Sequence, residues 1–329
     1  MKAQILRSFG STPDFAPGEV EKPQLKPGHV LIKVAATSVN PVDIKMRSLA
    51  PPFAPKPPAV MGMDVAGVVE AVGQGVTAFK PGDEVFGCPG GIADIPGALA
   101  EYMLADARLL ARKPARLSMA EAAALPLVTI TAWEALFDRA RLKPGQHALI
   151  HAGTGGVGHV AVQLAKAHGA RVATTVSSPE KAKLAESIGA DDIINYREED
   201  VAASVQRLTA GRGFDVVFDT VGGATLDASF QAAALYGTVV STNTRSSHDL
   251  SQLHAKGLTL SVVFMLLPLV TGQGRERHGE IMAQAAALAE AGKLRPVLAE
   301  RRFRFGEIAQ AQDYLASGKA VGKVVLEAD

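Results

Sequence analysis

A short stretch near the middle of the chain carries the residue spacing with the clearest chemical meaning. It reads LIHAGTGGVGHVAVQLAKAHGARVATTVSSPEKA and runs from Leu149 to Ala182. An apolar strand is expected to end at His151, and an amphipathic helix is expected to follow. Between them lies the pattern G-x-G-x-x-G, formed by Gly153, Thr154, Gly155, Gly156, Val157 and Gly158. In this context the pattern predicts a loop that holds the pyrophosphate of a dinucleotide; a glycine-rich turn without a ligand is the alternative.

The residues after the next expected strand indicate which dinucleotide would bind. An NAD site places an acidic residue about 20 positions beyond the glycines, where it accepts from the ribose 2′-hydroxyl. Here Ser177 and Ser178 occupy that region, and the first acidic residue is Glu180. Serine hydroxyls and the ammonium of Lys181 can donate to a 2′-phosphate, which a carboxylate would repel. Tyr196 could close this pocket, so we expect NADPH as the cofactor; an incidental lysine at a solvated helix start is the alternative.

Composition narrows the class of protein and its partners. The chain has 329 residues, a formal net charge of +1 and one cysteine. The mixed charges lack the basic stripe of a nucleic-acid-binding protein, and a single cysteine excludes internal disulfides and cysteine-rich zinc sites. The longest apolar run, Leu258–Val270, is shorter than the roughly 20 residues that a membrane span requires. With no signal-peptide pattern at the start, we expect a cytoplasmic protein.

The elements that must position these residues follow two different sequence patterns. The first third of the chain reads as strands and turns. After Pro144 and Gly145, short apolar runs alternate with helical segments, which predicts an α/β fold with a doubly wound parallel sheet. The expected strands of this sheet are 147–151, 171–176, 192–196, 214–220, 237–242 and 258–264. The tail strand VGKVVLEA breaks this alternation and is expected to return to the β-rich part.

Motifs in this order resemble the medium-chain dehydrogenase/reductase superfamily, and within it the zinc-free quinone oxidoreductases that include zeta-crystallin-like proteins. They are SVNPVDIKMR, MGMDVAGVVEAVG, FKPGDEVFG, GALAEYM, LPLVTITAWEAL, HAGTGGVGHVAVQLAK, GADDIINYREED and GKVVL. The resemblance implies a β-rich GroES-like substrate domain over residues 1–126 and 265–329. A Rossmann NADPH-binding domain would occupy 127–264. It also implies a homodimer that pairs the last strands, here 258–263.

The resemblance also assigns roles to individual residues. It places Ser177, Lys181 and Tyr196 at the 2′-phosphate, and Asn40 before the nicotinamide or the substrate carbonyl. The other positions that it implies to lie near the cofactor are Thr131 at the nicotinamide ribose, Asn243 at the carboxamide, and Lys323.

The zinc ligands of related enzymes are replaced in this chain. The corresponding stretches read Ser38-Val39-Asn40 and Gly62-Met63-Asp64, so asparagine and methionine stand in ligand positions. His147, His151 and His159 lie close in sequence, but no cysteine or acidic residue completes a zinc set with them. We therefore expect no metal, and we expect these histidines to be structural.

Without zinc, the chemistry that remains is hydride transfer to an acceptor that needs no Lewis acid. No tyrosine has a lysine four residues later, so a tyrosine–lysine pair for alcohol oxidation is missing. Quinones and α,β-unsaturated carbonyls place negative charge on an oxygen as hydride arrives, and hydrogen-bond donors stabilise that charge. Asn40 is the expected donor, with Asp43 and Asp64 nearby in sequence. We expect an NADPH-dependent quinone reductase; the alternatives are a reductase of alkenals, enones or enoyl compounds and a non-catalytic NADPH-binding protein.

Overall fold

The chain folds into two compact units, which the computed structural model describes over residues 1–328. One unit contains Met1–Ile130 and the chain from Leu266 onward, and the other contains Thr131–Met265. The domain boundaries expected from the sequence lie at 126/127 and at 264/265. Helix α3 (Pro126–Trp133) carries the chain across the first boundary. Each unit is described by itself below.

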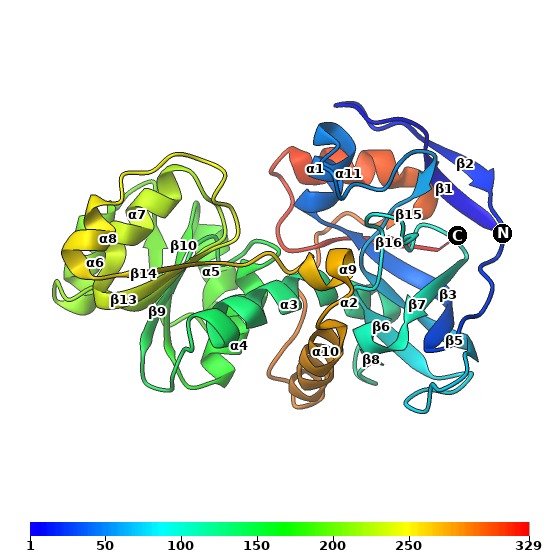
Figure 1. The fold of residues 1–329 in the computed structure, drawn as a ribbon. Coiled ribbons are helices and arrows are strands. Elements are labelled where there is room, and N and C mark those ends of the chain that lie inside the picture. The colour runs from blue at the N-terminus through cyan, green and yellow to red at the C-terminus, as the bar shows by residue number, and fades with distance from the viewer. Residues whose placement is uncertain (329) are drawn as a thin grey trace. The chain divides into compact units, whose positions relative to one another are not determined.

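The unit formed by residues 131–265 is built on a parallel sheet of six strands in the order β11-β10-β9-β12-β13-β14 (Figure 1). Its strands are β9 (His147–Ile150), β10 (Arg171–Val176), β11 (Asp192–Asn195), β12 (Phe214–Asp219), β13 (Ala233–Ser241) and β14 (Thr259–Val262). The order reverses between β9 and β12. This is the doubly wound Rossmann arrangement, whose ligands bind beyond the carboxyl ends of the strands at that reversal.

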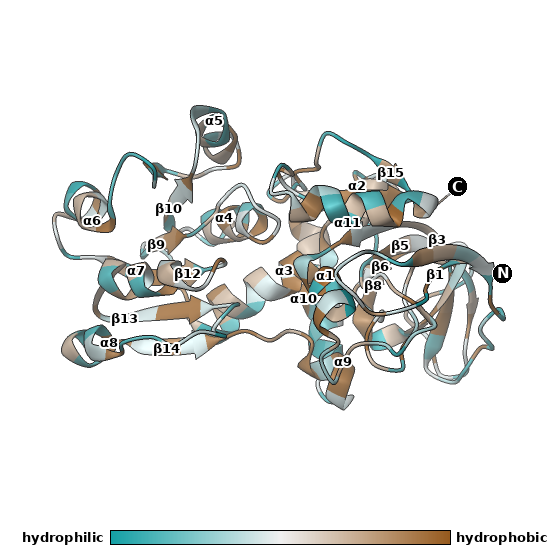
Figure 2. Cartoon of the chain, turned by 90° about the horizontal axis from the view of Figure 1, so that it is seen from above, coloured by the Kyte–Doolittle hydropathy of each residue, from teal (hydrophilic) through white to brown (hydrophobic). Residues whose placement is uncertain are grey.

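Helices connect these strands and cover the sheet. They are α4 (Gly158–Ala167), α5 (Pro179–Ser187), α6 (Val201–Thr209), α7 (Ala224–Ala232) and α8 (Ser251–Lys256), preceded by a π-helix (Glu134–Arg139). Figure 2 shows hydrophobic residues concentrated on strands such as β13, and hydrophilic stretches on α6 and α8. Leu149, Phe214 and Phe230 belong to the buried core of this unit. The edge strand β14 is partly exposed, with Val262 at 45%.

The other unit is β-rich and mostly antiparallel. It has a three-stranded sheet in the order β2-β1-β4 and a seven-stranded sheet along β15-β16-β3-β5-β6-β8, in which β7 also pairs with β3. Its strands are β1 (Lys2–Leu6), β2 (Phe15–Glu19), β3 (His29–Val39), β4 (Ala59–Val60), β5 (Val65–Val72), β6 (Glu84–Gly87), β7 (Tyr102–Asp106), β8 (Leu110–Arg112), β15 (Phe303–Arg304) and β16 (Val324–Glu327). The C-terminal strand β16 therefore returns to the unit in which the chain began.

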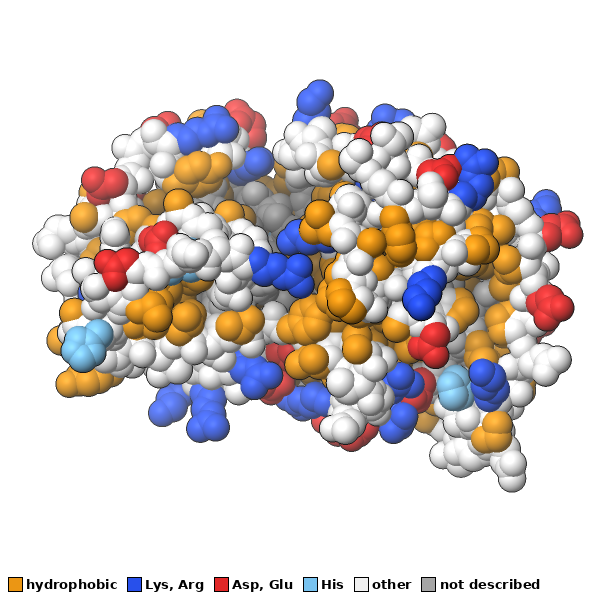
Figure 3. Space-filling model, turned by 45° about the horizontal axis from the view of Figure 1, so that its top comes forward, with side chains coloured by type: hydrophobic (Ala, Val, Ile, Leu, Met, Phe, Trp, Pro, Cys, Tyr) orange, Lys and Arg blue, Asp and Glu red, His pale blue; other side chains and the backbone are white. Residues whose placement is uncertain are grey.

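Helices and short turns complete this unit. They are α1 (Pro41–Leu49), α2 (Met119–Ala123), α9 (Leu267–Thr271), α10 (Arg275–Glu290) and α11 (Ile308–Ala316), with 3-10 turns η1 (Ala107–Leu109) and η3 (Phe305–Glu307). On the face shown in Figure 3, basic and acidic side chains are scattered among neutral and hydrophobic ones. None of the helices within residues 1–328 is both long and apolar enough to cross a bilayer.

The long strand β3 determines which polar residues meet at its carboxyl end. It pairs antiparallel with β5, with Ala36 opposite Ala66, and with β16, with Val39 opposite Val324. Extending these two registers places Ser38 beside Asp64, and Asn40 beside Lys323. Segments that are far apart in sequence are thereby brought to one point.

Candidate functional site

The glycine loop lies between the end of β9 and the start of α4, as the sequence predicts. A Cβ atom at Gly153 would overlap the side chain of Thr174 on β10, and one at Gly158 would overlap the carbonyl of Ala152. The first and third glycines are therefore required by close packing of the loop against the neighbouring strand and of the helix against the loop. Ala152 itself adopts a φ of 53°, in the left-handed region that is unfavourable for alanine. The loop is thus held in a specific, partly strained shape.

The predicted 2′-phosphate residues lie at the carboxyl ends of two adjacent strands. Ser177 follows β10, and Tyr196 follows β11; the Tyr196 amide donates to the carbonyl of Val176 at 3.2 Å. Ser178 caps α5 by accepting from the Lys181 amide at 3.4 Å, so Lys181 lies in the first turn of that helix. Tyr196 is 59% exposed. The structure therefore brings Ser177, Lys181 and Tyr196 to the carboxyl end of the sheet, which is also where the glycine loop lies.

Two further predicted cofactor residues belong to the same unit. Asn243 follows β13 and donates through Nδ2 to the Val221 carbonyl at 2.9 Å, which ties the loops after β13 and β12 together. Its backbone N–H donates to the hydroxyl of Ser241 at 3.1 Å. Thr131 lies on α3 and is 6% exposed.

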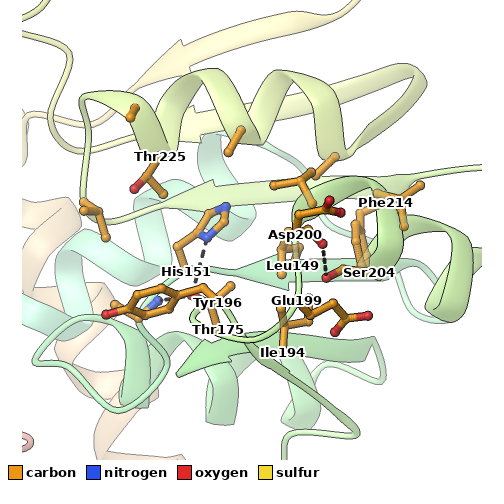
Figure 4. Close-up of a pocket in the computed structure, with 17 residues that line it drawn as sticks. Leu149, His151, Thr175, Ile194, Tyr196, Glu199, Asp200, Ser204, Phe214 and Thr225 are labelled. Atoms are coloured by element: carbon orange, nitrogen blue, oxygen red, sulfur yellow. Dashed lines mark hydrogen bonds between the residues drawn. The ribbon is translucent and has the colours of Figure 1, made fainter. Parts of the chain in front are cut away.

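A cavity of about 450 Å³ opens at this edge of the sheet (Figure 4). Its lining includes residues at or just after the carboxyl ends of four strands, namely Ala152, Thr175, Tyr196 and Val221. Its interior is mainly apolar and reaches Phe214 between the sheet, α6 and α7. A mostly apolar cavity with a few polar groups at a topological switch point is the usual form of a ligand site in such folds.

Asp219, Ser241 and His151 are buried at the carboxyl end of this sheet, and the sequence motifs did not identify any of them as part of the site. Asp219 accepts from the backbone N–H groups of Val221 and Gly222 at 2.9 and 2.8 Å, and so fixes the turn after β12. Ser241 donates to its other oxygen at 2.7 Å. His151, which we expected to be structural, lines the cavity and is 5% exposed. A sequence alone carries no signal for the direction in which such a side chain points.

In the β-rich unit, Ser38, Asn40 and Lys323 form a buried polar network around Asp64. Its carboxylate accepts from the Ser38 hydroxyl at 2.5 Å, the Asn40 side-chain amide at 2.8 Å and the Leu127 backbone N–H at 2.8 Å. The ammonium of Lys323 lies 3.4 Å from the same carboxylate. Asp64 is fully buried, and the Lys323 side chain is 3% exposed. A buried charge is tolerated only when it is paired and hydrogen-bonded in this way.

The same network fixes the orientation of the Asn40 amide. Lys323 can only donate hydrogen bonds, and it donates to Oδ1 of Asn40 and to the carbonyl of Val39. Asp64 accepts from Nδ2 of Asn40, so oxygen and nitrogen of the amide are unambiguously assigned. Lys323 thus lies against Asn40 and Asp64, and its ammonium makes its hydrogen bonds and its ion pair within the β-rich unit.

Asp43, the third predicted catalytic residue, lies beneath this network on α1. Its Oδ2 accepts from the Asn40 backbone N–H at 2.8 Å, whereas its buried Oδ1 accepts no hydrogen bond within residues 1–328. Burial raises the pKa of the Asp43 carboxyl to about 7, and the nearby Asp64 carboxylate adds to this effect. Among residues 1–328, no three or more His, Cys, Asp and Glu side chains are arranged to hold a metal ion.

The Asp64 network predicts that the loss of its cation destabilises the fold. Lys323→Met would leave the fully buried Asp64 carboxylate without its positive partner, and breaking a buried pair costs about 3–5 kcal/mol. We expect the free energy of unfolding, measured in urea, to fall by that amount. Lys319→Met, at an exposed lysine of the same segment, should change it little. Equal stability of the two variants would contradict the role of the network.

Because the pKa of Asp43 is raised in the folded state, replacing its carboxyl group should stabilise the fold, and the gain should grow as the pH rises. The unfolded carboxyl ionises near its ordinary 3.8, whereas the folded one keeps its proton until about pH 7. The folded state therefore loses stability relative to the unfolded state as the pH rises through this window. Asp43→Asn cannot ionise, so its stability relative to the native chain should rise from pH 4 to pH 8. Urea unfolding at both pH values, with the exposed Asp94→Asn as control, measures this; a pH-independent difference would show the expectation to be wrong.

Comparisons with known proteins are consistent with this geometry. The sequence model of the alcohol dehydrogenase GroES-like domain matches residues 26–115, and that of a zinc-binding dehydrogenase matches residues 188–326. The chain is 36% identical to a 2-methylene-furan-3-one reductase of Solanum lycopersicum over 99% of this chain and 79% of the relative. It is 30% identical to a human quinone oxidoreductase over 94% of this chain and 92% of the relative.

A solved structure extends the comparison to a bound cofactor. A mycobacterial protein complexed with NADPH superposes with a TM-score of 0.86 at 33% sequence identity, covering 99% of this chain and 100% of that one. Together with the parallel Rossmann sheet and the β-rich GroES-like unit, these matches show that the chain is an oxidoreductase of the medium-chain dehydrogenase/reductase superfamily, in the branch that contains the quinone oxidoreductases.

Proposed function

We propose that the protein is an NADPH-dependent reductase that transfers hydride to quinones without a zinc ion. The observation that carries the proposal is the set of groups at the carboxyl edge of the parallel sheet. Ser177 and Tyr196 follow the adjacent strands β10 and β11, Lys181 lies in the first turn of α5, and no carboxylate stands at the position that an NAD site requires. Hydroxyl and ammonium groups at that point favour a 2′-phosphate over a 2′-hydroxyl.

The residues present fit a dinucleotide. Gly153 and Gly158 leave no side chain between the loop and the start of α4, so the N-terminus of that helix can face a pyrophosphate. The cavity beyond the loop has room for the base. Asn243, held by the Val221 carbonyl, keeps its Oδ1 available for a carboxamide N–H. When bound, the cofactor would supply the hydride; the chain's own groups would bind and orient it.

The replaced zinc-ligand positions favour an acceptor that needs no Lewis acid. Asn40 and Met63 stand where zinc-dependent relatives hold the metal, and thioether and amide are poor zinc ligands. We assign the Asn40 amide, whose Nδ2 also donates to Asp64, as the donor to an oxygen on which charge develops. Lys323 and Asp64 hold that amide in place. The reduced oxygen would take its proton from solvent.

Reduction of an α,β-unsaturated carbonyl is the second candidate. The observation that favours it is the 36% identity to the tomato 2-methylene-furan-3-one reductase, which exceeds the 30% identity to the human quinone oxidoreductase. Both reactions deliver a hydride and leave charge on an oxygen, so the same Asn40 amide would serve either.

The cofactor assignment predicts the effect of restoring an acidic residue. Ser177→Asp would place a carboxylate beside the 2′-phosphate, and loss of a charge-assisted hydrogen bond costs about 1.5–3 kcal/mol. We expect kcat/KM for NADPH to fall by roughly tenfold or more, while kcat/KM for NADH is unchanged or rises. Ser187→Asp adds the same charge at the far end of α5 and should leave the ratio unchanged. A Ser177→Asp variant with the native preference would contradict the assignment.

The acceptor is tested by following NADPH oxidation with an ortho-quinone and a medium-chain enone in parallel. Faster turnover with the quinone is expected, and preference for the enone would move the protein to the alkene reductases. Tight NADPH binding with no turnover of either would contradict a catalytic role and leave a non-catalytic NADPH-binding protein.

A further inference from the structure

His151 presents an unpartnered polar atom to the cavity of the Rossmann unit. The residue is 5% exposed, and its Nε2 makes no hydrogen bond within residues 1–328. Figure 4 shows its imidazole pointing into the space between the strands and the helix that carries Thr225. Buried polar atoms in native proteins nearly always have a partner, so an orphaned one aimed into a cavity indicates a missing ligand.

The surroundings of the ring assign its tautomer. The hydroxyl oxygen of Thr175 accepts from the Ala152 backbone N–H at 2.9 Å, and it lies 3.4 Å from Nδ1 of His151. Donation by this hydroxyl to Nδ1 gives its hydrogen a partner. Nδ1 is then an acceptor, and the hydrogen of the neutral imidazole resides on Nε2, which therefore points into the cavity as a donor.

Burial keeps this imidazole neutral. Desolvation lowers the pKa of His151 to about 4, and the Asp219 carboxylate, which acts in the opposite direction, does not offset it. The group facing the cavity at neutral pH is thus an uncharged N–H. It suits an uncharged acceptor such as a ring nitrogen, and it offers little to a phosphate.

The position of the cavity relative to the glycine loop identifies the part of a dinucleotide that could reach it. With the pyrophosphate at the start of α4 and the ribose at Ser177, the base attached to that ribose is the next group along the molecule. Thr175, two residues before Ser177, and Tyr196, whose backbone N–H donates to the Val176 carbonyl just before Ser177, both line the cavity. A flat ring that enters a mainly apolar cavity leads with the edge opposite its sugar, which in adenine carries the ring nitrogen N1.

We propose that His151 reads the adenine base of the cofactor by donating a hydrogen bond from Nε2 to N1. This inference rests on the proposed dinucleotide-dependent function, but it holds for NADPH and NADH alike. His151 is then a binding residue for the base and has no role at the reacting atoms. Inside an apolar cavity such a bond discriminates strongly, because a base without the acceptor leaves the N–H unpaired.

The test compares ligands that contain the base with one that lacks it. His151→Phe keeps a ring of similar size and removes the N–H, whereas His151→Gln restores an N–H at a similar reach. His168→Phe, at an exposed histidine on the end of α4, is the matched control. Dissociation constants are measured for NADPH and for the fragment 2′,5′-ADP, and kcat/KM is measured with reduced nicotinamide mononucleotide as hydride donor.

We expect His151→Phe to weaken NADPH and 2′,5′-ADP binding by similar factors, roughly fivefold or more, and to leave turnover of the mononucleotide unchanged. His151→Gln should recover most of the affinity, and His168→Phe should behave as the native protein. Unchanged NADPH binding in His151→Phe, or an equal loss of kcat/KM with the mononucleotide, would overturn the proposed role of His151 and leave the proposed function standing. If the native protein bound neither NADPH nor NADH, the proposed function itself would fail, and this inference with it.

Discussion

A fully buried carboxylate organises the β-rich unit. Asp64 has no contact with solvent, so every polar atom around it must be supplied by the chain. Its donors come from the end of β3, the start of α3 and the residue before β16, which lies 259 positions away in sequence. Satisfying one charge thus requires three distant segments to meet with the correct register. The same requirement leaves the Asn40 amide fixed, with its oxygen on Lys323 and its nitrogen on Asp64.

The Rossmann unit depends on a different constraint, which is close approach of backbone. Gly153 and Gly158 are sites where any side chain would overlap a neighbour, and Ala152 accepts a left-handed conformation beside them. The carboxyl ends of β9, β10, β11 and β12 then surround one cavity. A helix N-terminus, two hydroxyl-bearing residues and a neutral histidine lie at this edge. Their chemistry is complementary to a pyrophosphate, a 2′-phosphate and a heterocyclic base, respectively.

Local patterns in the sequence predicted much of this architecture. The run at Arg171–Val176 is a strand with those bounds, because a short run of buried, largely β-branched residues between Gly169 and Pro179 specifies a central parallel strand locally. The strand expected to begin at Gly237 begins instead at Ala233, because Ala233 already pairs with Phe214 of β12; a bulge with Tyr236 at a φ of 60° then precedes the pairing of Thr238 with Val216. The preceding alanines read equally well as helix or strand, so periodicity could not decide the boundary.

The side-chain geometry of the site is harder to predict from the sequence than the strands and helices are. Asn40, Asp64 and Lys323 were recognised from motif position, but their mutual hydrogen bonds follow from the registers of β3 with β5 and β16, which one sequence does not display. The sequence predicts a structural His151 because no cysteine or acidic residue completes a zinc set with it, and one sequence does not display the cavity beside this residue. Asp219 belongs to no recognised motif. Its carboxylate accepts hydrogen bonds from two backbone N–H groups and so fixes the turn after β12.

The proposed function requires that this chain pass hydride from NADPH to a quinone with its own side chains and no metal. The most direct measurement is ortho-quinone-dependent oxidation of NADPH by protein dialysed exhaustively against a chelator. We expect turnover equal to that of the untreated protein, with NADPH preferred to NADH. Activity that disappears on dialysis and returns only with added Zn²⁺ would contradict it.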